Sequence, residues 1–289
     1  VYTDSAQTIW EIAGCGGPTK LAMLPVAEVD LGMWAPDDSA VLAFAPPLPQ
    51  RTATTITRLY IVSYNHAPLL LDVQLKPTEP VLTVDDAVWV NTTTLILRSH
   101  TDVFRMDVTT QAITMLPFKA TQIEWRNSVL YYSTVVNGQA ALHRYDPATG
   151  SDTRLLSLGV GQDSCQTWRC WSNAPWDVST DGMWVAHQYP LPKSIPTAQI
   201  ATTSLVLQSL DTNERIDVGS MPVSNAPIGL YISPDDHYIA ASGLDATQTS
   251  VPTTIDNLAG MPPLTVARSG RLVWLSLIHI SEPTRQAEI

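Results

Sequence analysis

Three tryptophans and an arginine lie close together between residues 168 and 176 and could form a binding surface. They are Trp168, Arg169, Trp171 and Trp176. Tryptophan and arginine often carry the energy of binding, because each combines a large contact area with a hydrogen-bond donor. Tryptophan is also a residue that proteins prefer to bury. The segment is therefore a candidate site for a protein, peptide or small ligand. The alternative is that its rings plug a channel or cover a neighbouring part of the fold.

Two cysteines, Cys165 and Cys170, stand directly before and inside this segment. Their spacing allows a small loop-closing disulfide, which is the pairing we expect, and two free thiols are the alternative. A metal site would need further thiols or nearby histidines, and the six histidines are scattered singly. We therefore predict no metal site.

Enzyme motifs are missing from the sequence. It contains no Gly-x-Ser-x-Gly elbow, no phosphate-binding Gly-x-x-x-x-Gly-Lys loop and no His-Glu-x-x-His helix. Three aspartate pairs could suggest paired carboxylates or a calcium site, but turns favour aspartate for local backbone bonding. The pairs are Asp37/Asp38, Asp85/Asp86 and Asp235/Asp236. We predict no catalytic residue and no cofactor.

The charge of the chain argues against two classes of partner. The 27 acidic residues outnumber the 16 basic ones, which gives a formal net charge of -11. Nucleic acids and anionic membranes are bound by clustered Lys and Arg, so neither is an expected partner. No apolar run approaches the roughly 20 residues that a membrane-spanning helix requires.

A repeated unit runs along the chain. A turn followed by an apolar strand recurs as APDDSAVLAF, STDGMWVAH and SPDDHYIAAS, with two degenerate copies that lack the Pro-Asp turn. The last strand residue before each turn is Trp34, Trp89, Trp125, Val178 or Ile232, about 50 residues apart on average, close to the period of propeller blades. Each unit continues into a second hairpin, so a module has four strands, for example 123–125, 129–133, 142–145 and 153–158. Helix signals are nearly absent.

These modules predict an all-β fold, a partial β-propeller of about five four-stranded blades in an incomplete ring. A sandwich domain needs roughly 100 residues, more than one module supplies. Residues 1–24 would be the remnant of one blade and residues 221–274 a blade without its last strand. The complete blades would span residues 25–76, 77–117, 118–160 and 161–220. Residues 275–289 break the pattern and resemble a translated sequencing-adapter read-through, so we interpret them as a non-native tail.

The SPDD and STDG turns, each followed by an aromatic and aliphatic strand, resemble the WD40-like repeats of TolB-type bacterial propellers. The resemblance implies a propeller fold and an extracytoplasmic location in the periplasm, at the cell surface or in the secreted fraction. It implies little about activity, because one fold serves many functions.

Three functions fit such a chain. The preferred one is a non-catalytic binding scaffold. The alternative is the substrate-gating propeller of a larger hydrolase of the prolyl-oligopeptidase type, whose catalytic domain would lie elsewhere. A propeller lyase or glycosidase is a third, which the single, scattered histidines do not favour.

Overall fold

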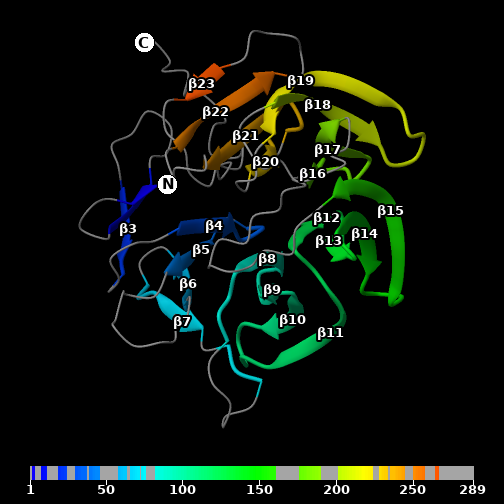
Figure 1. Cartoon of the computed structure of the whole chain (residues 1–289). Coiled ribbons are helices and arrows are strands. Elements are labelled where there is room, and N and C mark those ends of the chain that lie inside the picture. The colour runs from blue at the N-terminus through cyan, green and yellow to red at the C-terminus, as the bar shows by residue number, and fades with distance from the viewer. Residues whose placement is uncertain are drawn as a thin grey trace, which may run out of the picture.

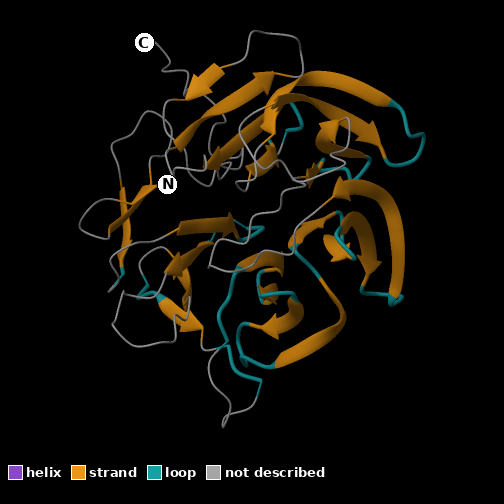
Figure 2. Ribbon diagram, viewed as in Figure 1, coloured by secondary structure: helices purple, strands orange, loops and turns teal. Residues whose placement is uncertain are grey.

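The structure is a computed structural model of the 289-residue chain, shown in Figure 1. All regular elements among the described residues are β-strands, as Figure 2 shows. Within these residues no helix is long and apolar enough to cross a membrane. The described ranges are 2–3, 8–11, 19–24, 30–37, 39–45, 58–63, 66–71, 73–75, 82–160, 176–189, 201–223, 228–233, 235–244, 250–257 and 264–266.

The strands form six antiparallel sheets. The first contains β1 (Tyr2–Thr3), β2 (Thr8–Glu11) and β3 (Thr19–Met23). The second contains β4 (Asp30–Trp34), β5 (Ala40–Ala45), β6 (Arg58–Ser63) and β7 (Leu69–Leu71). The third contains β8 (Asp86–Asn91), β9 (Thr94–Ser99), β10 (Asp102–Asp107) and β11 (Ile113–Lys119). The fourth contains β12 (Gln122–Arg126), β13 (Val129–Val136), β14 (Gln139–Asp146) and β15 (Ser151–Val160). The fifth contains β16 (Trp176–Val178), β17 (Trp184–Tyr189), β18 (Ala201–Ser209) and β19 (Arg215–Val223). The sixth contains β20 (Ile228–Ile232), β21 (Tyr238–Leu244), β22 (Ser250–Asn257) and β23 (Leu264–Val266).

The sheets are arranged around a common centre, as the blades of a propeller are (Figure 1). In each four-stranded sheet the strands lie in sequence order, and the first strand is the innermost. Consecutive first strands contact one another, in the series β4, β8, β12, β16 and β20. The prediction of an all-β partial propeller with an incomplete ring is therefore confirmed.

The third and fourth sheets are buried on both faces, because each lies between two neighbouring sheets. In β9, Leu95 and Leu97 belong to the core shared with the second sheet, whereas Ile96 between them belongs to the core shared with the fourth sheet. In β13, Tyr132 and Tyr131 divide between two cores in the same way. Successive side chains of a strand point to opposite faces, so a strand covered on both sides needs consecutive apolar residues. This requirement explains continuous runs such as TLIL.

The two degenerate repeats lack the Pro-Asp turn because they turn more tightly. Between β12 and β13 only Asn127 and Ser128 are unpaired, and both have positive φ angles, of 46° and 65°. This is the pattern of a two-residue type I′ hairpin, which accepts asparagine readily and has no place for proline.

The sixth sheet differs from the sequence prediction, which gave residues 221–274 no last strand. Strand β23 pairs with β22, from Thr253 opposite Val266 to Ile255 opposite Leu264. A three-residue strand is too short to show a periodic pattern and is therefore not predictable from the sequence. Two other strands pass the expected blade limits at 117 and 220, since β11 ends at Lys119 and β19 at Val223.

Truncation of a side chain between two blades should be costly. Leu142 is fully buried in the core between the fourth and fifth sheets. We expect Leu142→Ala to lower the free energy of unfolding by about 2–5 kcal/mol, through lost burial and the cavity left behind. Met115→Ala is the control, because Met115 is 52% exposed on β11, and its effect should stay within about 0.5 kcal/mol. Urea unfolding of both variants tests this, and equal effects would contradict the two-sided burial of the blades.

Candidate functional site

The binding segment predicted from the sequence falls almost wholly outside the described residues. This applies to Trp168, Arg169 and Trp171, and also to the disulfide candidates Cys165 and Cys170. Trp176 is described, and it is fully buried in the core between the fourth and fifth sheets. In this structure Trp176 covers the neighbouring blade, which is the alternative that the sequence had left open.

Backbone groups on the inner edges of the blades are bonded by side chains from the adjacent blade. The indole Nε1 of Trp89 donates to the carbonyl oxygen of Met33, at 3.3 Å. Gln122 Nε2 donates to the carbonyl oxygen of Trp176, at 2.7 Å. The backbone N–H of Ile232 donates to Asp177 Oδ2, at 2.6 Å. An edge strand exposes backbone donors and acceptors that must find partners when buried. We call these three contacts the inner-edge ties.

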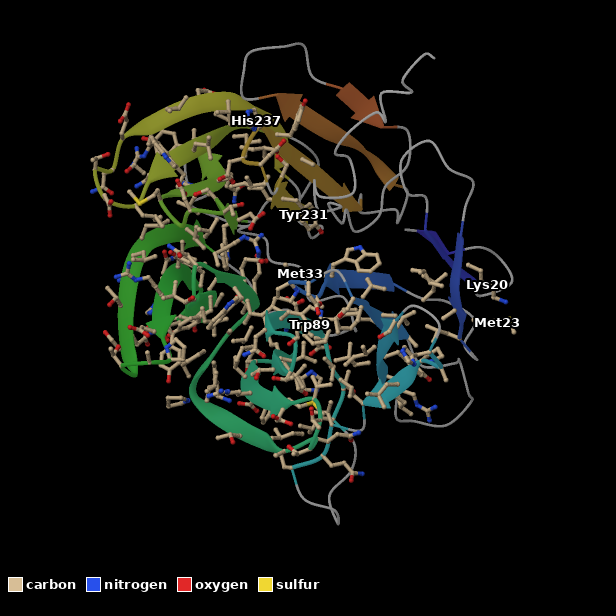
Figure 3. All side chains as sticks on the ribbon, turned by 180° about the vertical axis from the view of Figure 1, so that it is seen from behind. Lys20, Met23, Met33, Trp89, Tyr231 and His237 are labelled. Carbon is tan, nitrogen blue, oxygen red and sulfur yellow. The ribbon has the colours of Figure 1, made fainter. Side chains whose placement is uncertain are left out.

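Figure 3 shows three labelled residues of the innermost strands near the centre of the ring. They are Met33 on β4, Trp89 on β8 and Tyr231 on β20. Met33 and Tyr231 are half-buried, and Trp89 is buried. The inner wall is therefore built from large side chains as well as from the backbone ties.

A charged cluster belongs to the same wall. The guanidinium of Arg126, on β12, pairs with the carboxylate of Glu124 on the same strand and lies 3.8 Å from Asp177 Oδ1 on β16. The side chains of Arg126 and Glu124 are 20% and 15% exposed, and that of Asp177 is 5% exposed. Together with the bond from Ile232, Asp177 thus connects three consecutive inner strands, β12, β16 and β20.

Burial and the neighbouring charges have opposite effects on the pKa values of Asp177 and Arg126. Burial raises the pKa of Asp177, although Arg126 and the N–H groups of Ile232 and Val178 favour the carboxylate. Burial would lower the pKa of Arg126, but the carboxylates of Glu124, Asp177 and Asp236 outweigh it and raise that pKa. The guanidinium is therefore held positive among carboxylates. Such a group of side chains can form hydrogen bonds between blades and hold a partner's charged group.

The turns between first and second strands confirm the local role given to aspartate. Asp181 Oδ1 accepts from the N–H of Met183 at 2.8 Å, and the hydroxyl of Ser179 accepts from the N–H of Trp184 at 2.9 Å. The turn of the next blade repeats this pattern, with Asp235 and Ser233 as the acceptors. Asp37 accepts from Ser39 in the second sheet, and this bond lowers the pKa of Asp37. These aspartates are held by their own turns.

Three of these turns are bonded to one another across the blades. Asn127 Nδ2 donates to the carbonyl oxygen of Asp181, at 3.3 Å. The N–H of Thr180 donates to Asp236 Oδ1, at 2.9 Å. Tyr131 Oη also donates to the carbonyl oxygen of Gly182, at 3.3 Å. We call the described residues of these turns, 126–129, 179–184, 233 and 235–238, the turn rim. The bonds given above join its three parts to one another.

Large side chains are exposed on the turn rim. Met183 is 44% exposed and Tyr238 is 38% exposed. The imidazole of His237 is 69% exposed, and Figure 3 shows where it lies on the sixth sheet. A surface of this kind is fixed in shape before any partner arrives, which lowers the entropic cost of binding.

Asp85 departs from the turn role that the sequence predicted for the aspartate pairs. It stands directly before β8, with its side chain 2% exposed, and Arg98 Nη1 lies 3.9 Å from its Oδ2 atom. The N–H of His100 donates to the same oxygen, and His100 has a positive φ of 54°. Burial raises the pKa of Asp85, with Arg98 opposing that effect. No local pattern predicts this pair, because Arg98 follows an apolar run in β9 and lies 13 residues from Asp85 along the chain.

No group of three or more His, Cys, Asp or Glu side chains within the described residues is placed to hold a metal ion. The prediction that the chain has no metal site concerns the whole sequence and remains a prediction.

Comparison with known proteins agrees with the fold. No protein-family model matches the chain, and no curated protein matches its sequence. Among solved structures, a putative TolB from Agrobacterium tumefaciens matches with a TM-score of 0.57 and 13% identity, over 86% of this chain and 83% of that one. TolB from Acinetobacter baumannii matches with a TM-score of 0.61 and 13% identity, over 92% of this chain and 61% of that one. An oligogalacturonate lyase in complex with manganese matches with a TM-score of 0.55 and 10% identity, over 84% of this chain and 69% of that one.

The protein is thus a β-propeller by its sheet order and its ring of inner strands. Its structural neighbours are TolB and related propellers, as the repeat turns had indicated. At these identities the likeness defines the fold and carries no activity across.

Substitutions at two glycines, Gly182 on the turn rim and Gly150 between β14 and β15, distinguish the effect of backbone strain from that of a steric clash. Gly182 and Gly150 have similar positive φ angles, of 72° and 71°. A Cβ atom at Gly182 would lie 2.7 Å from Tyr131 Oη. A Cβ atom at Gly150 would meet no atom within 4 Å among the described residues, apart from its own residue and its two chain neighbours. Both Ala variants should lose about 1 kcal/mol to backbone strain. We expect Gly182→Ala to lose at least about 1 kcal/mol more in urea unfolding. Equal losses would show that Tyr131 does not fix this turn.

Loss of Arg126 should leave its carboxylate partners uncompensated. We expect Arg126→Met to lower the free energy of unfolding by about 3 kcal/mol at pH 7. Burial raises the pKa of Asp177 and Arg126 opposes that effect, so loss of Arg126 should raise this pKa further. The folded variant then takes up the proton at a higher pH than the wild type, and this uptake favours its folding as the pH falls. The deficit of Arg126→Met should therefore be smaller at pH 5 than at pH 7. Arg154→Met is the control, because Arg154 is exposed on β15. A deficit that does not depend on pH would contradict the buried pairing.

Proposed function

We propose that this propeller is a non-catalytic binding scaffold that presents one face of the ring to a protein or peptide partner. The observation that supports this proposal is the turn rim, in which three consecutive turns are bonded to one another across blades. Binding surfaces gain affinity when their parts are already fixed in the geometry of the complex. The exposed side chains of Met183 and Tyr238 supply apolar contact area on this rim.

The polar side chains of the inner wall support the same function. Gln122 and Asp177 bond to backbone groups of the next blade, and Arg126 is neutralised by carboxylates. These groups hold the blades in place, and the rim is built on the ends of the same strands. A partner would therefore meet a surface whose shape is set by the fold of the whole ring.

We place the protein outside the cytoplasm, in the periplasm, at the cell surface or in the secreted fraction. Support comes from the TolB-like repeats and from the candidate disulfide between Cys165 and Cys170. The segment with Trp168, Arg169 and Trp171 is a second candidate site for a partner, and the experiment below includes it.

Site-specific crosslinking tests the proposal. A photoreactive phenylalanine analogue is placed at Met183 on the turn rim, at Trp168 in the sequence-predicted segment, or at Met115 on the outer strand β11. Each protein is irradiated in an extract of the bacterial envelope. We expect a discrete crosslinked product from position 183 and none from position 115.

Variants of the rim then measure the contribution of its side chains. Met183→Ser combined with Tyr238→Ser should weaken binding of the crosslinked partner at least about tenfold, because large buried contacts dominate interface energies. The thermal stability of this variant should stay close to that of the wild type. A product from position 168 alone, or binding that the double variant leaves unchanged, would overturn the rim as the binding face.

A further inference from the structure

A buried histidine lies at the centre of a polar network in the fifth sheet. His187, on β17, is 1% exposed. Its Nδ1 atom lies 2.8 Å from the backbone oxygen of Gln188, and its Nε2 atom lies 3.0 Å from Oε1 of Gln208 on β18. Both ring nitrogens therefore face oxygen acceptors. A neutral imidazole carries one N–H, and only the imidazolium can donate from both nitrogens.

The orientation of the Gln208 amide is set by two further partners. Its Oε1 atom also accepts from Nε of Arg215, at 3.0 Å, and its Nε2 atom donates to Oδ1 of Asn213, at 3.1 Å. Arg215 is the first residue of the outer strand β19. Its guanidinium lies 4.5 Å from the ring centre of Tyr189, which is 39% exposed at the end of β17. The network thus runs from a buried ring to an exposed aromatic side chain.

We propose that His187, Gln208 and Arg215 form a proton-controlled relay, in which the proton on His187 Nε2 decides whether Gln208 holds Arg215. The amide orientation described above is the one that the protonated ring requires. There, Gln208 Oε1 accepts one hydrogen bond from the imidazolium and one from Arg215.

Loss of that proton to solvent reverses the preferred direction of the amide. Nδ1 keeps its hydrogen, because the backbone oxygen of Gln188 can only accept. Nε2 then presents a lone pair, and Gln208 satisfies it by turning its NH2 group toward the ring. Gln208 Oε1 then faces Asn213 Oδ1, so the side-chain amide of Asn213 must turn as well and donate to it. In that orientation the NH2 group of Gln208 also faces the Nε–H of Arg215, donor against donor. Arg215 is released from Gln208 while its guanidinium remains near Tyr189.

The surroundings of His187 favour the neutral ring. Burial lowers the pKa of His187, the bonds to Gln208 and Gln188 oppose that effect, and the charge of Arg215 adds to it. The register partners of His187 are Trp176 on β16 and Val206 on β18, which are not ionisable. From the fourth sheet, Gln122 donates to the carbonyl oxygen of Trp176, and Gln122 is not ionisable either. Arg215 is thus the charge that acts on the ring among the described residues.

The lowered pKa of His187 makes the stability of the folded protein depend on pH. Because the pKa of His187 is lowered in the folded protein, the unfolded chain binds the proton first as the pH falls. The contribution of this group to stability is complete above about pH 6.5 and decreases as the pH falls from there to the folded-state value. The relay therefore changes state below neutral pH.

Nitrogen-15 NMR of the full chain tests the relay. Spectra of the ring nitrogens of His187 and of the Nε–H of Arg215 are recorded across the titration, and His187→Gln and Arg215→Lys assign the signals. As the pH rises through the His187 midpoint, Nε2 should lose its proton and Nδ1 should keep it. Protection of the Arg215 Nε–H from exchange should fall about tenfold at the same midpoint, as expected for loss of one hydrogen bond.

The Gln208→Glu variant provides a second, independent test of the relay. A carboxylate accepts from both neighbours in either orientation, so the His187 midpoint should rise by about one unit or more and Arg215 should stay protected throughout. Gln139→Glu adds the same charge at an exposed position of β14 and should leave the midpoint unchanged. The proposal is overturned if Arg215 protection does not change at the His187 midpoint of the wild type, or if the neutral ring carries its proton on Nε2. It is also overturned if a folded Gln208→Glu protein keeps the wild-type midpoint.

Discussion

The inner edge of each blade is the constraint on which this structure depends. A four-stranded sheet whose first strand is innermost has unpaired backbone groups along that strand, and burial makes them costly unless they find partners. Here the adjacent blade supplies them, through Trp89, Gln122 and Asp177. The apolar faces impose the same order, since a sheet inside the series needs a neighbour on both sides. The inner-edge ties at the centre and the apolar cores between the sheets therefore both require the same order of blades around the ring.

The charged wall and the turn rim follow from that arrangement. Arg126 lies at the end of β12, directly before the turn of Asn127, and Asp177 lies at the same level of the next blade. Once the inner strands are side by side, the turns that end them are neighbours as well, and they bond through Thr180 and Asp236. The packing of the inner strands thus holds neighbouring blades together and also fixes the shape of the turn rim, which is the binding surface that we propose. The comparisons agree with the fold, and the sequence-predicted segment at Trp168 remains a separate hypothesis.

His187 and Asp85 show how buried ionisable groups fit into this framework. Each lies at the end of its blade opposite to the turn rim, where a second strand ends. Asp85 faces Arg98, a charge of opposite sign, whereas His187 faces uncharged oxygen acceptors. The first arrangement is a fixed pair of opposite charges. The second can exist in two protonation states, and the relay proposed for Gln208 rests on that difference.

The sequence by itself determined the all-β class, the four-stranded repeat and the position of most strands. These properties are local: Asp181 and Asp235 bond to their own turns, and alternating burial follows from strand geometry. Only the tertiary structure decided that Trp176 is buried, that Asp177 meets Arg126 and Ile232, and that His187 reaches Arg215. The physical reason is distance along the chain. These partners are brought together by the packing of whole strands and blades, which no local pattern encodes.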